Sequence, residues 1–388
     1  MPDSILFTIF LIFTGSALVA TLALFARQAM IVGYILLGML LGPHMLGLVQ
    51  DPDLISQMSH IGIIFLLFLL GLDLPPRKLM GMLGETVIVT GLSSLAFFVI
   101  AAIVLRLAGF GWIETLIASA AFTFSSTIIG LKLLPTTILH HRRTGEIIIS
   151  ILLFQDVLAI ILLMAIEMAG TGEADTRRLF VLTLALPGLF GLALWLARRL
   201  VVPLIARFDT IQEYVFLLTI GWCLGIAELA GAMGLSQEIG AFMAGVALAS
   251  SPVAQYIAES LKPLRDFFLI IFFFALGAGF DPMLLPQIWM PALALALLAL
   301  LVKPWVFRRL LVRAGEDPQR SAEIGVRLGQ ISEFALLVAV LAQQNGVIPE
   351  RASILVQAAT LLTFIASGYW VVMRYPTPVA VNEKLRRN

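Results

Sequence analysis

The stretch GEIIISILLFQDVLAIILLMAIEM, residues 145–168, decides how the rest of the chain is interpreted. It is long enough to cross a bilayer as a helix, because about 20 predominantly apolar residues suffice. Two polar residues, Gln155 and Asp156, stand near its middle. An ionisable side chain at that depth costs roughly 2.5–3.5 kcal/mol even on the lenient insertion scales, and such residues commonly mark ion or proton pathways. The stretch therefore predicts a membrane helix whose carboxylate has a function.

The composition of the whole chain also indicates a membrane protein. Of its 388 residues, 60% are hydrophobic and only 13% are charged, whereas soluble domains average about 25% charged residues. The formal net charge of +1 lacks the excess of positive charge that is typical of nucleic-acid-binding proteins. The only cysteine, Cys223, excludes an internal disulfide. Because the first residues lack a basic segment, we expect a retained first helix and not a cleaved signal peptide.

Apolar runs separated by Pro, Gly and charged residues predict thirteen membrane spans. Each should be helical, because lipid offers no partner for exposed backbone polar groups. The predicted spans are 4–25, 29–47, 55–73, 84–106, 112–134, 145–168, 179–200, 213–230, 235–250, 264–280, 290–311, 321–343 and 352–373. No long hydrophilic segment interrupts them. We therefore expect one all-α polytopic membrane domain over residues 1–375 and a short cytoplasmic tail over residues 376–388.

The placement of Lys and Arg orients these spans, since cytoplasmic loops carry the excess of basic residues. One set of loops, together with the C-terminal tail, contains Arg27, Arg77, Lys78, Arg142, Arg143, Arg198, Arg199, Arg207, Lys262, Arg265, Arg308, Arg309, Arg313, Arg320, Arg374, Lys384, Arg386 and Arg387. The opposite loops contain only Arg106, Arg177, Arg178 and Arg351. This asymmetry predicts an outer N-terminus and a cytoplasmic C-terminus. Glu228 and Glu238 flank an outer loop, where we expect solvated span ends.

Four ionisable residues form the set predicted at mid-membrane depth: Asp156, Lys303, Arg327 and Glu333. At about 3 kcal/mol each, their summed insertion cost approaches the whole stability of a typical domain. For Asp156 two interpretations are open. It is either a structural salt-bridge partner of Lys303, or a site for a proton or a cation that faces a protein cavity. In the second case Gln155 supplies a neutral carbonyl acceptor beside it but no second charge.

Two of the spans carry polar residues at their centres. Span 112–134 contains Thr123, Ser125, Ser126 and Thr127, and span 321–343 contains the segment RLGQISEF, residues 327–334. Corresponding polar or glycine-containing interruptions in two halves of a transporter point to discontinuous helices at an ion site. The alternative for the hydroxyl groups is that they only bond back to their own helix.

The ends of such broken helices carry partial charges, negative at the carbonyl end and positive at the N–H end. Lys303 and Arg327 are the candidates to partner the negative ends. Glu333 is the candidate for a positive end, or for a pair with a basic residue.

Seven segments, in order along the chain, resemble the Kef-type potassium/proton antiporters of the cation:proton antiporter-2 superfamily. The segments are MIVGYILLGMLLGP (30–43), IGIIFLLFLLGLDL (61–74), FTFSSTIIGLKLL (122–134), FQDVLAI (154–160), LSQEIGAFMAGVALA (235–249), FFFALGAGFDP (272–282) and RLGQISEFALLVAVL (327–341). The Gln-Asp pair is the most specific element of this resemblance, which covers nearly the whole chain.

The resemblance implies an inverted repeat with two crossed, unwound helices, spans 112–134 and 321–343. It implies a transport core over residues 84–168 and 290–373, a dimer scaffold over residues 1–80 and 213–282, and a linker helix over residues 179–200. The homodimer would sit in the cell inner membrane and need no organic cofactor. The core would move like an elevator.

In that resemblance Asp156 carries the monovalent cation and the proton in turn, and Lys303 is the basic residue of the core. Family members usually continue into a cytoplasmic nucleotide-binding regulatory domain, so we expect either a truncated chain or a short member with a separate regulator. Their glutathione-gated members have an acidic loop, which here is diluted by Lys262 and Arg265.

Together these features predict a monovalent cation/proton antiporter that favours potassium. Because one carboxylate beside a neutral amide exchanges one proton for one monovalent cation, we expect electroneutral exchange. The alternatives are a sodium/proton antiporter or channel-like potassium efflux on the same fold. An intramembrane aspartyl protease is disfavoured, since it needs two membrane aspartates and Asp156 is the only aspartate at mid-depth.

Overall fold

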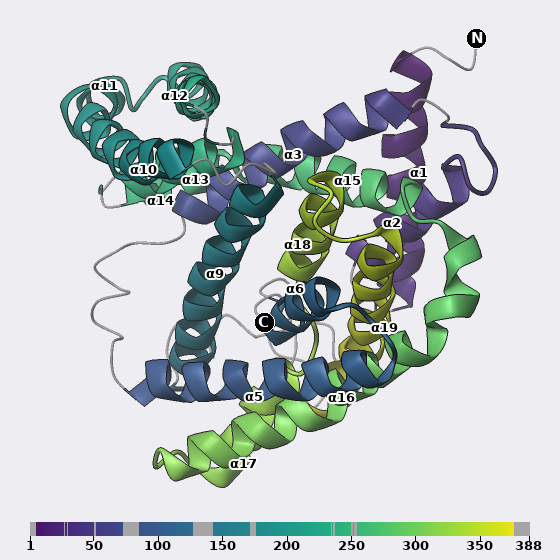
Figure 1. Ribbon diagram of the computed structural model, residues 1–388. Coiled ribbons are helices and arrows are strands. Elements are labelled where there is room, and N and C mark those ends of the chain that lie inside the picture. Colours follow the sequence, from purple (N-terminus) through teal and green to yellow (C-terminus); the bar gives the residue numbers. More distant parts are fainter. Residues whose placement is uncertain are drawn as a thin grey trace.

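Helices form all the regular structure in the part of the chain that the computed structural model describes (Figure 1). The described residues are 5–26, 28, 30–49, 52–72, 85–126, 143–170, 176–233, 235, 237–249, 251 and 254–375. Seven of the described helices are long and apolar enough to cross a membrane on their own. The chain is therefore a multi-pass, all-α membrane protein, as the sequence predicts.

The first half of the chain contains α1 (Ile5–Phe25), α2 (Met30–Leu41), α3 (Pro52–Leu72), α5 (Glu85–Leu107), α6 (Trp112–Thr123), α9 (Arg143–Gly170) and α10 (Thr176–Leu196). The second half contains η1 (Ala197–Val201), α11 (Val202–Arg207), α12 (Gln212–Ala232), α13 (Gln237–Ala249), α14 (Ala254–Ser260), α15 (Lys262–Ala278), η2 (Pro282–Leu284), α16 (Leu285–Arg313), α17 (Pro318–Arg327), α18 (Glu333–Gln344) and α19 (Glu350–Arg374). Each of the thirteen predicted spans overlaps at least one of these helices.

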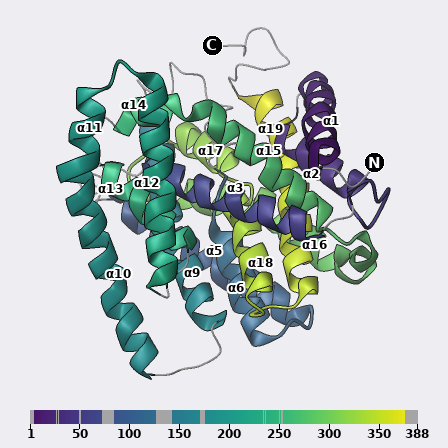
Figure 2. The ribbon, with the colours of Figure 1, turned by 90° about the horizontal axis from the view of Figure 1, so that it is seen from above.

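Besides span 112–134, in which α6 ends at Thr123, three of the predicted spans differ from the observed helices in form. In span 29–47 the helix ends at Leu41, and the chain then turns through Gly47, whose φ of 61° suits glycine. Span 179–200 continues beyond its predicted end, through the π-helical turn η1 and α11 to Arg207. Figure 2 shows α10 and α11 as one long rod at the edge of the molecule, beside α12. Span 321–343 is not one helix but two, α17 and α18.

Helices α2 and α15 pack against each other at unusually short range. A Cβ atom added at Gly38 of α2 would lie 2.0 Å from the carbonyl oxygen of Phe274. A Cβ atom at Gly277 of α15 would lie 2.0 Å from the carbonyl oxygen of Ile35. Only glycine fits where two helix backbones come this close, which is the small-residue packing typical of membrane helices.

Helices α3 and α13 repeat the same arrangement. Cβ atoms added at Gly71 of α3 and Gly245 of α13 would lie 2.4 Å and 2.1 Å from backbone oxygens of the facing helix. The two helix pairs therefore share one kind of close packing. In the inverted repeat that the resemblance implies, α2 corresponds to α13 and α3 to α15, so the two pairs would be equivalent.

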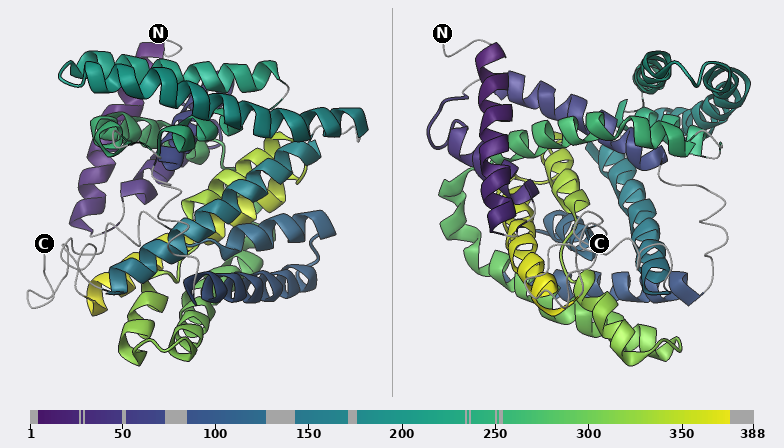
Figure 3. Two further views of the ribbon diagram at one scale, coloured as in Figure 1. Left: turned by 90° about the vertical axis from the view of Figure 1, so that its left-hand side faces the viewer. Right: turned by 180° about the vertical axis from the view of Figure 1, so that it is seen from behind.

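The remaining long helices surround two short ones. Figure 1 shows α6 and α18 between α9 and α19, with α5 and α16 along the lower side of the molecule. The view from behind in Figure 3 gives the same order, with α9 and α19 on opposite sides of α6 and α18. Helix α18 packs against α6, α9 and α19, and α16 packs against α5, α17 and α19. The two short helices thus end inside the molecule, enclosed by longer ones.

The close contact of α2 and α15 makes a testable prediction. Gly277→Ala places a methyl group against a backbone oxygen that cannot rotate away, so we expect a loss of about 1–3 kcal/mol of stability or more. Gly91→Ala is the matched control, because Gly91 lies in α5 with open space at its Cβ position. Alanine is the better helix former there. In thermal unfolding in detergent, Gly277→Ala should melt at a lower temperature than the wild type, and Gly91→Ala should not. Equal melting temperatures for the two variants would contradict the packing argument.

Candidate ion site

The second of the two short helices begins at a break in the predicted span 321–343. Helix α17 ends at Arg327, residues 328–332 are not helical, and α18 begins at Glu333. The Oγ of Ser332 accepts a hydrogen bond from the backbone N–H of Phe334 at 3.0 Å and so caps α18. The sequence prediction of a discontinuous helix is confirmed here.

The break lies directly against α16. A Cβ atom added at Gly329 would lie 2.9 Å from Cγ of Pro304, and one at Gly325 would lie 2.6 Å from the Pro304 carbonyl oxygen. Two glycines on one side and a proline on the other therefore let the end of α17 approach α16 closely. Lys303, which precedes Pro304, is held beside the break by this contact.

The first short helix, α6, ends at Thr123 inside the predicted span 112–134. Phe124 is extended, with φ −73° and ψ 145°. The Oγ1 of Thr123 donates to the carbonyl of Ala120 at 2.8 Å, which is the local alternative foreseen for these hydroxyl groups. Thr127 lies outside the described residues.

Side-chain hydrogen bonds join the two breaks to each other. The Oγ of Ser125 donates to the carbonyl oxygen of Leu328 at 2.8 Å. The Nε2 of Gln330 donates to the carbonyl oxygen of Ser126 at 3.3 Å. Each bond joins residues about 200 positions apart in the sequence, so the non-helical residues 124–126 that follow α6 meet the break between α17 and α18. This is the crossing that the resemblance implies.

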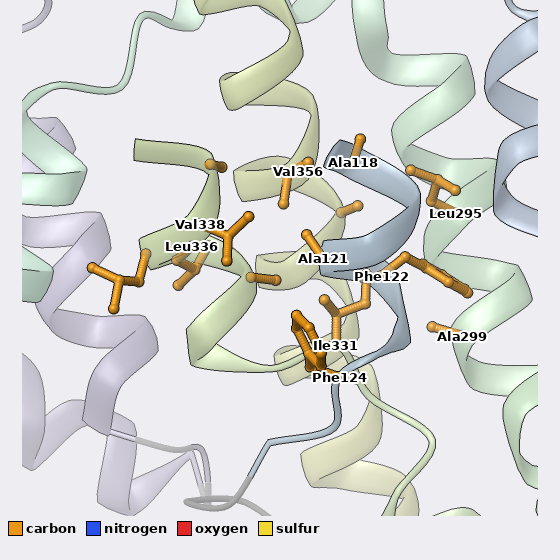
Figure 4. Close-up of a cluster of buried hydrophobic side chains, with 14 of the residues drawn as sticks. Ala118, Ala121, Phe122, Phe124, Leu295, Ala299, Ile331, Leu336, Val338 and Val356 are labelled. Atoms are coloured by element: carbon orange, nitrogen blue, oxygen red, sulfur yellow. The ribbon is translucent and has the colours of Figure 1, made fainter. Parts of the chain in front are cut away.

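An apolar shell encloses this crossing. Figure 4 shows Phe124 and Ile331 next to each other where the chain leaves the two breaks. The surrounding side chains come from α6, α16, α18 and α19 and include Ala118, Ala121, Phe122, Leu295, Ala299, Leu336, Val338 and Val356. Because these side chains offer no hydrogen bonds, the polar groups of the breaks depend on polar partners that reach them from within the protein.

Lys303 provides the largest number of these partners. Its Nζ donates to the carbonyl oxygens of Phe122 at 3.1 Å, Phe124 at 2.9 Å and Gln330 at 3.1 Å. The side chain is fully buried, and Nζ lies 5.2 Å from the ring centre of Phe97. An ammonium has three donors, so all three are used on the negative ends of the two breaks. The partners of Lys303 in these three bonds are carbonyls, as predicted for the broken helices.

Gln155 has a different role from the one that the sequence suggests. Its Oε1 accepts from the backbone N–H of Ser125 at 2.9 Å, and its Nε2 donates to the carbonyl of Thr123 at 3.2 Å. One amide of α9 therefore pairs both a donor and an acceptor that the end of α6 leaves free. The next residue, Asp156, is buried in α9 with 4% of its surface exposed. The first break is held directly beside this carboxylate.

The other two members of the predicted ionisable set lie at the ends of the second break. Arg327, in the last turn of α17, pairs with Glu323 one turn earlier, with 2.8 Å between Nη2 and Oε1. Its cation therefore lies at a helix C-terminus, where the dipole favours it. Glu333 is in the first turn of α18, at the positive end predicted for it.

Sequence reasoning missed three other polar side chains. Glu238, expected at a solvated span end, is 8% exposed, and its Oε1 lies 2.8 Å from Nε2 of His60 on α3. Thr363 and Ser367 of α19 are buried and bond to the second break. The signals in the sequence were a histidine and two hydroxyl residues inside apolar spans. They did not identify the partners, which lie far away in sequence.

Comparison with known proteins adds to this geometry. Residues 10–373 match the family described as "Sodium/hydrogen exchanger, transmembrane". The "Iron transporter MagA" of Paramagnetospirillum magneticum is 30% identical, over 89% of this chain and 80% of the relative. The "K(+)/H(+) antiporter subunit KhtU" of Bacillus subtilis is 28% identical, over 97% of this chain and 94% of the relative.

A longer relative and a solved structure complete the comparison. The "Putative K(+) efflux antiporter KefB" of Alkalimonas amylolytica is 30% identical over 88% of this chain, which spans only 52% of that relative's length. The sodium proton antiporter MjNhaP1 of Methanocaldococcus jannaschii superposes with a TM-score of 0.68 at 17% identity, over 93% of this chain and 94% of that chain. At this identity the likeness shows the fold alone.

The role of Lys303 is open to a direct stability test. Lys303→Met keeps the length of the side chain but leaves three buried carbonyls without their donor, so we expect a loss of at least ~2 kcal/mol. The variant also removes the cost of burying an ammonium group. This gain does not offset the loss, because the three carbonyls stay buried without a donor. Lys303→Gln retains an N–H donor and should be less destabilised. Thermal unfolding of purified protein measures both; a Met variant as stable as the wild type would contradict the assignment.

Proposed function

Because the chain belongs to the sodium/hydrogen exchanger transmembrane family, and so to the secondary transporters rather than the enzymes, we propose that it exchanges potassium for protons across the cell membrane. Cation/proton antiport is the chemistry of this family, and potassium is the finer part of the proposal. The observation that carries it is Asp156, a buried carboxylate on α9 next to the amide that holds the first helix break.

Antiport follows from the chemistry of one carboxylate. Asp156 binds either a proton or a cation, because each neutralises the same charge. A cation that leaves its hydration shell needs several oxygen ligands, more than one carboxylate provides. In the proposal Ser125, Ser126 and Thr127 supply further hydroxyl or backbone oxygens from the first break. Gln155 and Thr123 keep the break in position.

The preference for potassium rests on the names of two relatives, which describe a K(+) efflux antiporter and a K(+)/H(+) antiporter subunit. Another relative is named an iron transporter. A single carboxylate matches one monovalent charge, whereas divalent transition metals favour several nitrogen, sulfur or carboxylate ligands. Among the described residues, no three His, Cys, Asp or Glu side chains come together. We therefore propose a monovalent substrate.

The proposed mechanism is an elevator-like movement of a core over residues 84–168 and 290–373. The hydrogen bonds of the crossing all lie within this core, so it can move as one unit. The scaffold over residues 1–80 and 213–282 contains both glycine-packed helix pairs. The long helix over residues 179–200 links the two parts.

The proposed assembly is a homodimer in the cell inner membrane, with the N-terminus outside and the C-terminus in the cytoplasm. The excess of basic residues in one set of loops supports this orientation. A cytoplasmic regulatory domain or separate subunit is proposed because the longer relative continues well beyond the matched region and the shorter one is named a subunit. Light scattering of the detergent-solubilised protein tests the dimer, and a monomeric mass would contradict it.

Proteoliposomes loaded with a pH-sensitive dye test the exchange itself. Addition of K⁺ should drive proton movement at a lower concentration than Na⁺, Li⁺ or Fe²⁺. Asp156→Asn should abolish the signal, because the amide binds neither the proton nor the cation as a carboxylate does, while the purified variant stays folded. Cation-dependent proton flux that persists in Asp156→Asn would remove this carboxylate from the proposal. Proton movement in response to Fe²⁺ but to none of the alkali cations would contradict the proposal of a monovalent substrate.

The same vesicles, clamped at several membrane potentials, give the stoichiometry. One-for-one exchange moves no net charge, so the K⁺/H⁺ reversal point should not shift with voltage. One extra charge would be worth ~2.3 kcal/mol per 100 mV. A reversal point that moves with voltage contradicts electroneutrality, and its return to voltage independence in Glu333→Gln would identify the second titrating carboxylate.

A cross-link tests the elevator movement. A Cβ atom at Gly368 of α19 would lie 3.4 Å from Oε1 of Gln28, so these positions join the proposed core to the proposed scaffold. In a Cys223→Ser background, cysteines at 28 and 368 joined by a short bifunctional reagent should stop transport. Cysteines at positions 60 and 238, both within the scaffold, are the matched control and should leave transport unchanged. Full transport by the cross-linked 28/368 protein would contradict the movement.

A further inference from the structure

Two hydroxyl side chains of α19, Thr363 and Ser367, contact the second break. Helix α19 lies on the opposite side of α6 and α18 from α9 (Figure 3). The two residues are one turn apart on the helix and 0% and 1% exposed. Buried hydroxyl groups are expected to have hydrogen-bond partners. Their partners here are not only in their own helix but also in the break, which gives them a role beyond helix packing.

Thr363 fixes a backbone donor of the break. Its Oγ1 donates to the carbonyl of Thr360 at 2.8 Å and accepts from the backbone N–H of Ile331 at 3.1 Å. A hydroxyl group has one hydrogen to donate. Since that hydrogen is used within α19, the lone pairs of Oγ1 are directed toward the break. The N–H of Ile331, which lies in the non-helical break, thereby has a side-chain acceptor from α19.

Ser367 acts through an intermediate side chain. Its Oγ donates to Oε1 of Gln330 at 3.2 Å, and Nε2 of Gln330 donates to the carbonyl oxygen of Ser126 at 3.3 Å. Two consecutive hydrogen bonds therefore connect α19 to a carbonyl of the first break. Ser126 is one of the residues proposed above to face the transported cation.

Helix α19 thus does for the second break what α9 does for the first. Gln155 of α9 accepts from the N–H of Ser125, and Thr363 of α19 accepts from the N–H of Ile331. The residue that follows differs between the two: Asp156 in α9, and the fully buried Phe364 in α19. The second repeat therefore keeps the hydrogen bond to the break without the charge.

We propose that Thr363 and Ser367 are positioning residues that set the cation preference of this exchanger, an inference that rests on the function proposed above. Selectivity among alkali cations depends on the number and arrangement of the oxygen ligands. Thr363 fixes the backbone at Ile331, and Ser367 fixes the amide of the neighbouring Gln330, which holds the Ser126 carbonyl. Removal of either hydroxyl lets that carbonyl move, although neither hydroxyl contacts the ion.

Thr363→Val tests the first hydroxyl, because it keeps the shape of the side chain and removes the acceptor. We expect the half-saturating K⁺ concentration to rise roughly fivefold, the change that one typical hydrogen bond is worth. The ratio of half-saturating K⁺ to Na⁺ concentrations should change by about twofold or more. Thr363→Ser retains the hydroxyl and should restore the wild-type ratio.

The matched control is Thr360→Val, one turn away on the same helix. Thr360 is equally buried, but its Oγ1 donates only to the carbonyl of Val356 in its own helix, at 2.7 Å. A merely structural effect of losing a buried hydroxyl lowers the melting temperature in both Val variants and leaves the K⁺/Na⁺ ratio unchanged. A positioning role changes that ratio in Thr363→Val alone.

Ser367→Ala tests the second hydroxyl, and Gln330→Leu tests the route through which it acts. If Ser367 acts through Gln330, the double variant should have the same K⁺/Na⁺ ratio as Gln330→Leu alone. Ion-dependent shifts in melting temperature give the same ratio without transport, because a bound cation stabilises the folded state.

Two outcomes overturn the inference: wild-type ratios in both Thr363→Val and Ser367→Ala, or a full additional effect of Ser367→Ala in the Gln330→Leu background. If Thr363→Val does not fold, Ser367→Ala and the double variant decide. A wild-type protein that shows no cation-dependent proton flux instead contradicts the proposed function, so the two failures are distinguishable.

Discussion

Backbone groups without helical partners, deep inside a membrane protein, are the constraint on which the rest of this structure depends. Two helices break near mid-span, and lipid cannot satisfy the groups that the breaks leave free. The ammonium of Lys303 pairs with three of the carbonyls at once. Amides and hydroxyls from α9 and α19 pair with N–H groups. The three carbonyls stabilise the buried ammonium of Lys303, and the ammonium in turn supplies the donors that these carbonyls lack.

The same constraint explains why the helices around the crossing pack so closely. Gly325 and Gly329 bring α17 against Pro304, and this contact places the neighbouring Lys303 at the break. Elsewhere, glycine pairs hold α2 to α15 and α3 to α13 by backbone contact. Neither device uses charge or long side chains, since apolar packing between helices gains nothing over lipid except through close fit. The polar groups are in this way concentrated at the crossing.

The sequence predicts the helices and the breaks but not most of the partners at the site. Apolar runs of about 20 residues report membrane helices directly, and the polar segment RLGQISEF within one of them predicts a break that the structure confirms. The amide of Gln155 pairs with the first break, which local sequence does not predict, since its partner Ser125 lies 30 residues away. Glu238 was expected in solvent, yet it is buried against His60 from another repeat. Such pairs depend on tertiary contact, which local pattern does not encode.

The unequal use of charge in the two repeats gives the crossing its chemical direction. In both repeats a side chain accepts from an N–H of the break, Gln155 in one and Thr363 in the other. The first repeat follows it with a carboxylate, Asp156, and the second with Phe364. Lys303 of the second repeat donates to carbonyls of both breaks and lies against the ring of Phe97 in the first repeat. The crossing therefore combines Lys303, whose three donors pair with backbone carbonyls, with Asp156, the buried carboxylate proposed above to exchange a proton for a cation.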